Sequence, residues 1–200
     1  QENGPLDMRM DATKENAVTA FQIINFWTEQ KLRDLFFLYG EERYSKYIAK
    51  AIIQYREKYG NISCTEELVG IIRRVLPQPV QRKMGGHPAR RVFQSLRIAV
   101  NNELESLKES ILDAHNVIDD DGLIFVVSYH SLEDKIVKQL FNKFINDKSG
   151  YLYNKKVIKP SSEEIDNNYR SRSAKMRVFI KYNKILTTKE KSRWTDPLSL

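Results

Sequence analysis

The chain has little of what covalent or metal cross-links require. Cys64 is the only cysteine among the 200 residues, which excludes a disulfide framework within one chain. A single thiol and three histidines show no spacing typical of a metal site, and we expect no bound metal. A reducing compartment, the cytoplasm, is therefore the expected location.

Long apolar segments are also missing. No run approaches the roughly 20 apolar residues that a membrane-spanning helix needs, so we expect no membrane association. No signal peptide and no Arg-rich transit segment is recognisable at the start. With 41% hydrophobic and 30% charged residues, the composition is typical of a globular protein that can bury one ordinary core plus a smaller appendage.

Acidic residues become scarce toward the carboxyl end. The formal net charge is +7, but residues 1–40 carry four basic and six acidic side chains, whereas residues 170–193 carry nine basic and one acidic. A concentrated basic segment is typical of a nucleic-acid binder, because each phosphate that is neutralised releases counterions. A solvated basic tail is the simpler alternative.

A short apolar, β-rich run over residues 123–129 leads directly into the amphipathic pattern of a helix over residues 131–146. Ser131 is the expected N-cap of this helix, and Asp134, three residues later, resembles the acidic member of a capping box. The inward face of the helix is expected to consist of Ile136, Val137, Leu140, Phe141 and Phe144.

The end of this strand is the best candidate for a functional site. In open α/β sheets ligands bind beyond the carboxyl ends of strands, which is where Ser128, Tyr129 and His130 lie. The alternative is purely structural, with Ser131 only a cap, His130 only a turn residue and Asp134 only a partner of the helix dipole.

Residues 14–86 read as a helical subdomain. Apolar residues recur at helical spacing from Ala17 to Leu38, and Thr28 is expected to cap the second of two short helices there. A firmer helix is predicted over residues 41–59. The stretch Val80–Gly86 is basic and contains a glycine pair, which predicts an exposed loop.

A long helix is predicted to begin at His87-Pro88, because proline suits the first helical position. Its apolar residues step by three or four and form one core-facing stripe: Phe93, Leu96, Val100, Leu104, Leu107 and Ile111. A polar edge able to bind phosphate or a base edge runs beside that stripe: Arg90, Gln94, Arg97 and Asn101. The alternative is that these polar residues border the core and pair with neighbouring carboxylates.

The last part of the chain alternates strands with polar links. Strands are predicted over residues 155–159 and 176–182, and residues 184–200 show no periodicity and are expected to form a flexible tail. Between the strands, Arg170 and Arg172 are interleaved with hydroxyl side chains. Guanidinium groups offer a planar fork of donors that suits phosphate.

Five sequence blocks together resemble the signature blocks of the RsmH/MraW family of small-subunit ribosomal RNA methyltransferases. They are GPLDMRMD (4–11), YGEER (39–43), HPARRVFQSLRIAVN (87–101), SYHSLEDKIVK (128–138) and RSRSAKMR (170–177). The blocks occur in family order, so together they are more specific than any one of them.

The resemblance implies an α/β fold, namely part of a class I Rossmann-like methyltransferase with an inserted all-helical subdomain. Residues 1–13 are then a loop of the methyltransferase domain, residues 14–86 the insertion, and residues 87–183 the C-terminal part of the methyltransferase domain. Residues 184–200 are the expected tail.

The glycine-rich turn after a strand, and the acidic residue that would hold the cofactor's ribose, are missing from this sequence. The adjacent glycines Gly85-Gly86 lie between predicted helices. In the family those elements precede the block at residues 4–11, so we expect this chain to be the C-terminal portion of a longer enzyme. It would then lack most of the S-adenosylmethionine pocket and expose an apolar strand edge and face.

The resemblance implies methylation of the exocyclic amine (N4) of a cytosine in small-subunit ribosomal RNA, with S-adenosylmethionine as the methyl donor. The partner is that RNA or the small ribosomal subunit, and the oligomeric state, a homodimer included, stays open. Ser128, Tyr129 and His130 are expected to line the target-base pocket, with Asp7 and Arg9 close by. The residues expected to hold the RNA are Arg90, Arg97, Asn101, Arg170, Arg172 and Lys175.

Two other functions fit the same sequence. One is a non-catalytic RNA-binding or ribosome-assembly module, and the other is a homologous methyltransferase that acts on organellar ribosomal RNA.

Overall fold

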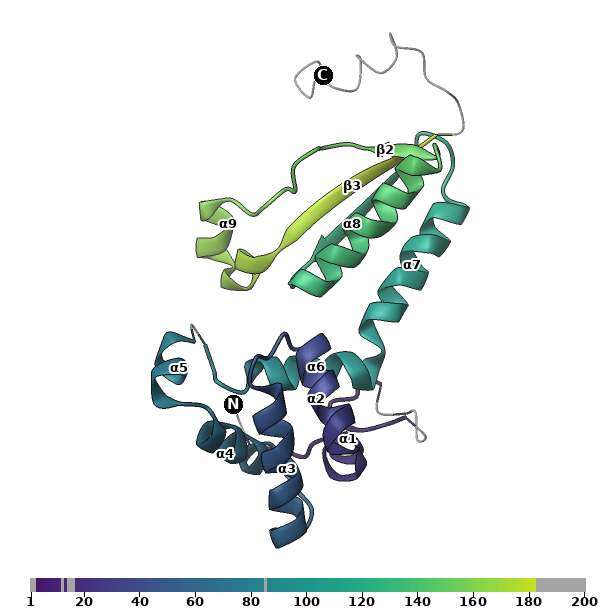
Figure 1. Ribbon diagram of the computed structural model, residues 1–200. Coiled ribbons are helices and arrows are strands. Elements are labelled where there is room, and N and C mark those ends of the chain that lie inside the picture. Colours follow the sequence, from purple (N-terminus) through teal and green to yellow (C-terminus); the bar gives the residue numbers. More distant parts are fainter. Residues whose placement is uncertain (1–2, 12, 14–16, 85, 183–200) are drawn as a thin grey trace. The chain divides into compact units, whose positions relative to one another are not determined.

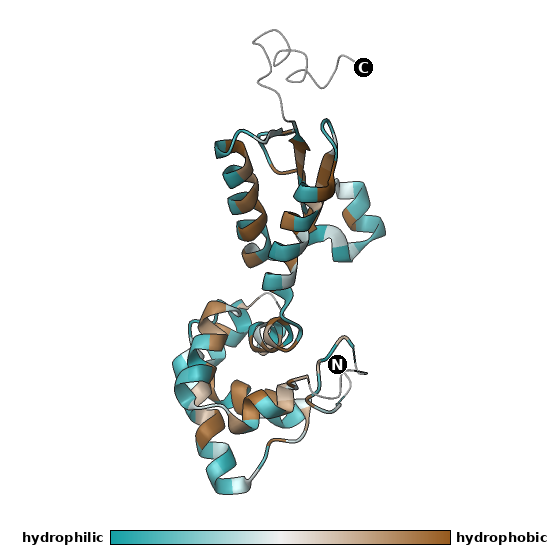
Figure 2. Ribbon diagram, turned by 90° about the vertical axis from the view of Figure 1, so that its right-hand side faces the viewer, coloured by the Kyte–Doolittle hydropathy of each residue, from teal (hydrophilic) through white to brown (hydrophobic). Residues whose placement is uncertain are grey.

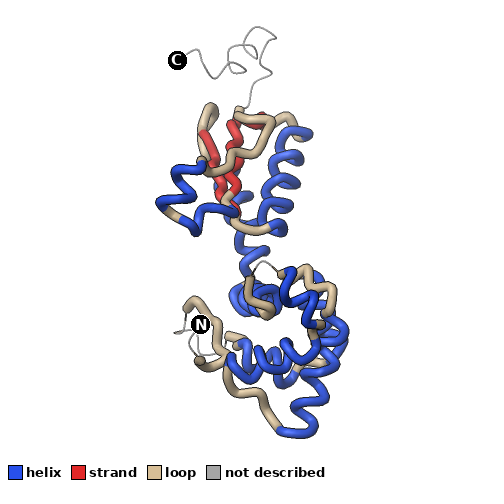
Figure 3. The backbone as a smooth tube through the Cα atoms, turned by 90° about the vertical axis from the view of Figure 1, so that its left-hand side faces the viewer, coloured by secondary structure: helices blue, strands red, loops and turns tan. Residues whose placement is uncertain are grey.

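The computed structural model describes residues 3–11, 13, 17–84 and 86–182 (Figure 1). Contacts divide the chain into two compact units, unit 1 (residues 1–103) and unit 2 (residues 104–200). The described part of unit 1 is built from helices, whereas unit 2 combines helices with strands (Figure 3). The tail predicted over residues 184–200 lies outside the described residues.

Unit 1 begins with two short helices that are separated where the sequence predicts. Thr28 accepts a hydrogen bond from the backbone N–H of Lys31 at 3.3 Å and so caps the second helix. The helices of the unit are α1 (Ala20–Phe26), α2 (Glu29–Leu38), α3 (Ser45–Tyr59), α4 (Thr65–Val75), α5 (Gln78–Lys83) and α6 (Arg90–Asn101).

The loop predicted over residues 80–86 is wrong in its first part, because α5 extends to Lys83. The prolines before it explain the difference. Pro77 is the N-cap of α5 and Pro79 lies in its first turn, where proline needs no N–H partner and has a suitable φ. These prolines therefore start a helix as well as ending α4.

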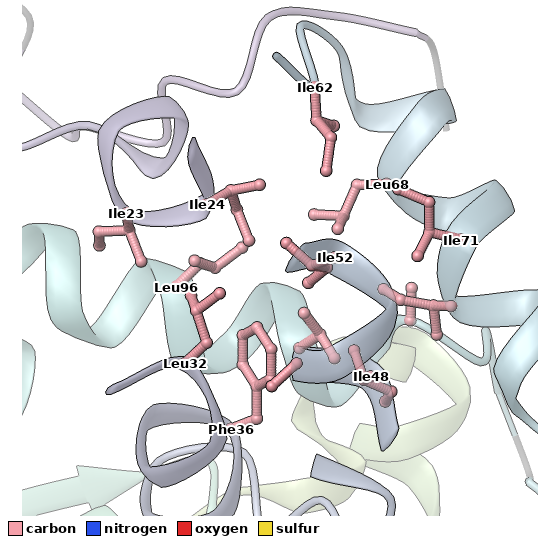
Figure 4. Packing of buried hydrophobic residues seen from close by; sticks show 14 of the residues in the cluster. Ile23, Ile24, Leu32, Phe36, Ile48, Ile52, Ile62, Leu68, Ile71 and Leu96 are labelled. Atoms are coloured by element: carbon pink, nitrogen blue, oxygen red, sulfur yellow. The ribbon is translucent and has the colours of Figure 1, made fainter. Parts of the chain in front are cut away.

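The core of unit 1 lies between α1, α2, α3, α4 and α6 (Figure 4). Phe36 of α2 and Ile52 of α3 are fully buried beside Leu96 of α6. Leu6, from the segment that precedes α1, is buried in the same core. By contacts, α6 and the N-terminal segment thus pack with the helices of the predicted insertion. The assignment of the segments to an inserted and a methyltransferase part stays a prediction.

The single long helix predicted from Pro88 onward is wrong. It is interrupted at Asn102, which has φ 51° and separates α6 from α7 (Glu103–Val117). Asparagine tolerates this left-handed conformation better than most residues, because its side chain is short and polar. The break divides the apolar stripe, so Leu96 packs into the unit 1 core and Ile111 into the unit 2 core.

Unit 2 contains a three-stranded antiparallel sheet in the order β1-β3-β2. In its register, Ser128 at the end of β1 lies opposite Lys175 at the start of β3. The fold is thus mixed α/β, as predicted at that level. The elements after α7 are β1 (Leu123–Ser128), α8 (Ser131–Asn146), β2 (Gly150–Leu152), α9 (Ser162–Asn167), the 3₁₀ helix η1 (Tyr169–Ser173) and β3 (Lys175–Lys181).

One face of this sheet carries the core of unit 2. Phe179 of β3 packs against Phe141 and Phe144 of α8, with ring centroids 5.3 and 5.4 Å apart. The inward face predicted for α8 is confirmed: Val137, Leu140, Phe141 and Phe144 are buried and Ile136 is partly buried. Colouring by hydropathy shows that the strands are largely hydrophobic and that the helices have a hydrophobic and a hydrophilic side (Figure 2). On the opposite face of β1, Phe125 is 60% exposed.

The strand predicted over residues 155–159 is wrong, because only Ile158 pairs there, in an isolated bridge with Met176. The short strand β2 lies earlier and pairs with the other end of β3. Gly150 permits this close approach, since a Cβ at this position would collide with the carbonyl oxygen of Ile180 and the ring of Phe179. Among the described residues, no helix combines the length and the apolar character that crossing a bilayer requires.

Candidate functional site

The first candidate residues lie where β1 ends in unit 2. Ser128 is buried and its hydroxyl donates to the backbone carbonyl of Lys175 at 3.3 Å, which ties the end of β1 to the start of β3. Tyr129 is 55% exposed. Its backbone N–H donates to Glu133 Oε2 at 2.7 Å, so the backbone is fixed while the phenol ring stays accessible.

His130, and not Ser131, is the N-cap of α8. Its Nδ1 accepts from the backbone N–H of Glu133 at 3.4 Å, and Glu133 Oε2 accepts from the backbone N–H of His130 at 3.2 Å. The predicted capping box is therefore wrong by one residue. An imidazole nitrogen here replaces the hydroxyl or carboxylate oxygen that normally caps a helix.

The cap also restricts the chemistry of His130. Because Nδ1 accepts a hydrogen bond, the neutral ring carries its proton on Nε2. Nε2 is buried and lies 3.3 Å from Glu133 Oε1, in a geometry that makes no hydrogen bond, and it has no hydrogen-bond partner among the described residues. In the neutral ring the N–H at Nε2 is thus enclosed beside the Glu133 carboxylate and is not open to solvent.

Asp134 connects α8 to β3. Its Oδ1 accepts from Arg177 Nε at 2.7 Å, and its Oδ2 lies 3.4 Å from Lys175 Nζ. The hydrogen bond from Arg177 lowers the pKa of Asp134, and the charges of Arg177 and Lys175 lower it further against the opposing effect of burial. Lys175, expected to hold RNA, thus has a carboxylate partner within the protein.

The predicted arginine pair lies in η1, immediately before β3. Arg170 and Arg172 are both exposed. The guanidinium of Arg172 lies 4.2 Å from the centre of the Tyr169 ring and donates to the carbonyl of Tyr169 at 3.2 Å. Tyr169 is 68% exposed. This segment therefore exposes two cations, Arg170 and Arg172, and the aromatic ring of Tyr169.

In unit 1, Asp7 and Arg9 form a bidentate ion pair. Arg9 Nε donates to Asp7 Oδ1 at 2.7 Å and Arg9 Nη2 donates to Asp7 Oδ2 at 2.8 Å, across Met8, whose φ is 64°. The hydrogen bond from Arg9 lowers the pKa of Asp7. The loop thus presents a fixed carboxylate and guanidinium.

Asn101 holds this loop against α6. Its side-chain amide donates to the carbonyl of Met8 at 2.9 Å, and its oxygen accepts from the backbone N–H of Met10 at 2.8 Å. Arg97, one turn earlier, forms a bidentate pair with Glu103 at 2.7 and 3.0 Å. Arg97 therefore pairs with a carboxylate, as the structural alternative predicts, whereas Asn101 bonds to the backbone of the loop.

The structure brings the predicted residues together in two groups. Asp7, Arg9 and Asn101 meet at the end of α6 in unit 1, with Arg97 one turn away. Arg90 lies at the other end of α6 and is exposed. In unit 2, Ser128, Tyr129, His130 and Lys175 gather where β1 and β3 meet, next to the arginines of η1.

Glu133 and Arg177 are the contributors that the sequence interpretation missed. Glu133 binds the backbone N–H groups of both Tyr129 and His130, and Arg177 holds Asp134. The signal for Glu133 was its position three residues after His130. It was overlooked because histidine is not among the usual capping residues.

The described strands end without a glycine-rich turn. β1 continues into Ser128-Tyr129-His130, β2 into Tyr153-Asn154 and β3 into Tyr182, so none of these strands leads into the glycine-rich turn that lets a backbone approach such a group.

Comparison with known proteins identifies the family. The sequence profile of the MraW methylase family matches residues 1–182. Similar proteins named ribosomal RNA small subunit methyltransferase H occur in Oceanobacillus iheyensis (44% identical over 191 residues), Pseudothermotoga lettingae (45% over 177) and Ehrlichia canis (44% over 186). These matches cover 88%, 88% and 90% of this chain and 58%, 58% and 61% of the respective relatives. The chain thus spans about three fifths of the length of these relatives, and it belongs to the MraW methylase family.

Proposed function

We propose that this chain is the substrate-side portion of an enzyme that methylates the exocyclic amine (N4) of a cytosine in small-subunit ribosomal RNA. S-adenosylmethionine is the proposed methyl donor, and a class I Rossmann-like fold with a helical insertion is the proposed architecture of the whole enzyme. The family and the names of the relatives support ribosomal RNA methylation. Because none of the described strands leads into a glycine-rich turn, we assign the donor no contacts here.

One observation carries the substrate side of this proposal. The polar end of β1 lies beside an exposed arginine segment within the same unit, since Ser128 pairs with Lys175 and η1 ends directly before β3. The exposed ring of Tyr129, which can contact a base, and the arginines, which can contact the adjoining phosphates, then belong to neighbouring segments of one unit. Such an arrangement suits RNA better than it suits a small metabolite.

The chemistry of the target explains which groups are needed. The lone pair of the cytosine amine is delocalised into the ring, so the protein must hold the amine in a fixed orientation. A base that is stacked must first leave its stack, at a cost of a few kcal/mol. Tyr129 has an exposed ring that can stack on the displaced base. His130 fixes the turn at the end of β1 through its cap, and because its Nε2 is buried we assign that atom no contact with the base.

The binding part is tested with Arg170→Ala combined with Arg172→Ala. We expect weaker binding of a labelled small-subunit RNA fragment. The slope of log K against log salt concentration should also become flatter by about 1 for each phosphate contact that is lost. The matched control, Lys138→Ala with Lys143→Ala on the exposed side of α8, removes the same charge from the same unit. Equal binding by the parent and the arginine variant would reject the assignment.

The catalytic part is tested with the full-length gene product, small ribosomal subunits and isotopically labelled S-adenosylmethionine. Nuclease digestion and mass spectrometry should then identify N4-methylated cytidine. Label in another base or position would reject the proposed reaction. RNA binding that persists without any methyl transfer would favour a non-catalytic RNA-binding module, for which the basic segments provide the independent support.

A further inference from the structure

Unit 1 contains a concentration of positive charge of its own, in addition to the arginines of η1 in unit 2. Residues 68–102 contain seven lysines and arginines and no aspartate or glutamate. Two of the seven are bound within unit 1, because Arg91 donates to the carbonyl of Glu41 at 3.3 Å and Arg97 pairs with Glu103. The other five, Arg73, Arg74, Arg82, Lys83 and Arg90, are exposed, and the described residues give them no ion pair. We call these five residues the basic corner.

Specific contacts bring the basic corner together. Gln81 of α5 donates from Nε2 to the carbonyls of Arg73 and Leu76 at 2.8 and 2.7 Å, so α5 is attached to the end of α4 (Figure 1). Arg73 Nη2 lies 3.4 Å from His87 Nε2. The Arg90 side chain folds back to within 3.9 Å of where a Cβ of Gly86 would lie. The ends of α4 and α5 and the start of α6 therefore share one surface.

Helix dipoles explain only part of this charge. Arg73 and Arg74 lie in the last turn of α4, and Arg82 and Lys83 in the last turn of α5, where cations are favourable. Arg90 is instead the first residue of α6, where a cation is unfavourable, and no acidic residue occurs in that first turn. A segment that adds an arginine against the dipole and contains no aspartate or glutamate suits a polyanion.

We propose that the basic corner is a phosphate-binding surface of unit 1 that holds the RNA backbone, in addition to the target-base site proposed at the end of β1 in unit 2. This inference rests on the proposed function, which makes RNA the polyanion. Four of its five residues are arginines, whose planar forks suit phosphate oxygens. The contact is independent of sequence and acts on affinity, so it changes KM and leaves kcat unaltered.

The test compares two double variants of the 200-residue chain with equal loss of charge. Arg82→Gln with Lys83→Gln removes two exposed cations of the basic corner. The control, Lys50→Gln with Lys58→Gln, removes two exposed cations from α3, whose last turn lies well away from α5 (Figure 1). Dissociation constants for a fluorescent small-subunit RNA stem are measured by anisotropy over a range of KCl concentrations.

For the Arg82/Lys83 variant, we expect the slope of log K against log salt concentration to become flatter by about 2. Its affinity for RNA at low salt should fall by about tenfold. The control should change much less. If both variants lost the same RNA affinity, the change in net charge alone would explain the effect, and the proposal would be overturned. An unchanged salt dependence in the Arg82/Lys83 variant would also overturn it. Circular dichroism checks that both variants keep the parent helix content.

Arg90→Gln provides a second test that does not touch α5. We expect the salt dependence to fall by about 1 while stability is unchanged or higher, because a cation leaves the start of a helix. Loss of both binding and stability would indicate a structural role. Displacement of the RNA by polyglutamate at equal charge concentration would indicate an acidic protein partner and overturn the proposal.

The outcomes are separable from those of the proposed function. If no methyl transfer is found but the basic-corner variants still lose RNA binding, this inference stands and the reaction fails. If methyl transfer is found and these variants bind RNA normally, the reaction stands and this inference fails.

Discussion

Replacing Asp134 with asparagine should destabilise unit 2 by about 2 kcal/mol. The carboxylate holds Arg177 and Lys175, and the side chains of Asp134 and Arg177 are only 17% and 15% exposed. A charge-assisted hydrogen bond contributes about 1.5–3 kcal/mol, and breaking a fully buried pair costs about 3–5 kcal/mol. The lower range applies, because the pair keeps some contact with water and asparagine can still accept one hydrogen bond.

Hydrogen exchange resolves this effect better than a single melting curve, because a chain of two compact units need not unfold in one step. Amides of α8 and β3 that exchange through opening of unit 2 should exchange about 30-fold faster in Asp134→Asn, whereas α2 and α3 in unit 1 should be unaffected. The control Glu105→Gln breaks the pair between Glu105 and Lys108, whose side chains are 49% and 47% exposed, and should leave the exchange rates nearly unchanged because water screens this pair. Equal effects of the two substitutions would refute the reasoning.

The pH dependence gives an independent check. The pKa of Asp134 is lower in the folded state than in the unfolded chain, so its stabilising contribution is complete above about pH 4 and is lost as the pH falls through the lowered pKa. The difference in stability between parent and Asp134→Asn should therefore be constant from pH 7 to about pH 5 and decrease in more acidic solution. A difference that grows with acidification contradicts the assignment.

Two further predictions concern local geometry. Glu133→Ala should cost about 1 kcal/mol and speed amide exchange at Tyr129 and His130, whereas Glu133→Gln should lose less, since glutamine can also accept at this position. Gly40→Ala should destabilise unit 1 by about 1–3 kcal/mol in Trp27 fluorescence melts, because its Cβ would lie 2.7 Å from the carbonyl oxygens of Phe36 and Arg91. Gly70→Ala, with open space around the new methyl group, should be neutral or stabilising by up to about 1 kcal/mol.

Local sequence determined the elements whose signals lie within a few residues of each other. The division between α1 and α2 follows from Thr28, and the buried side of α8 follows from apolar residues three and four apart. β1 and β3 were also evident, because each is a β-rich run of adequate length. These features depend on backbone capping and on the periods of helices and strands, which a sequence records directly.

The tertiary structure decided what depends on residues that are distant in the sequence. Leu96 and Ile111 share one helical stripe in the sequence, yet they enter two different cores because Asn102 interrupts the helix. Asp134 could have been only a partner of the helix dipole, and its actual partner Arg177 lies 43 residues away. Such pairings are set by the packing of helices and strands against one another, and local spacing contains no record of them. The sequence by itself thus placed the strand end and the arginine segment, whereas the fold decided which of their side chains remain available to a ligand.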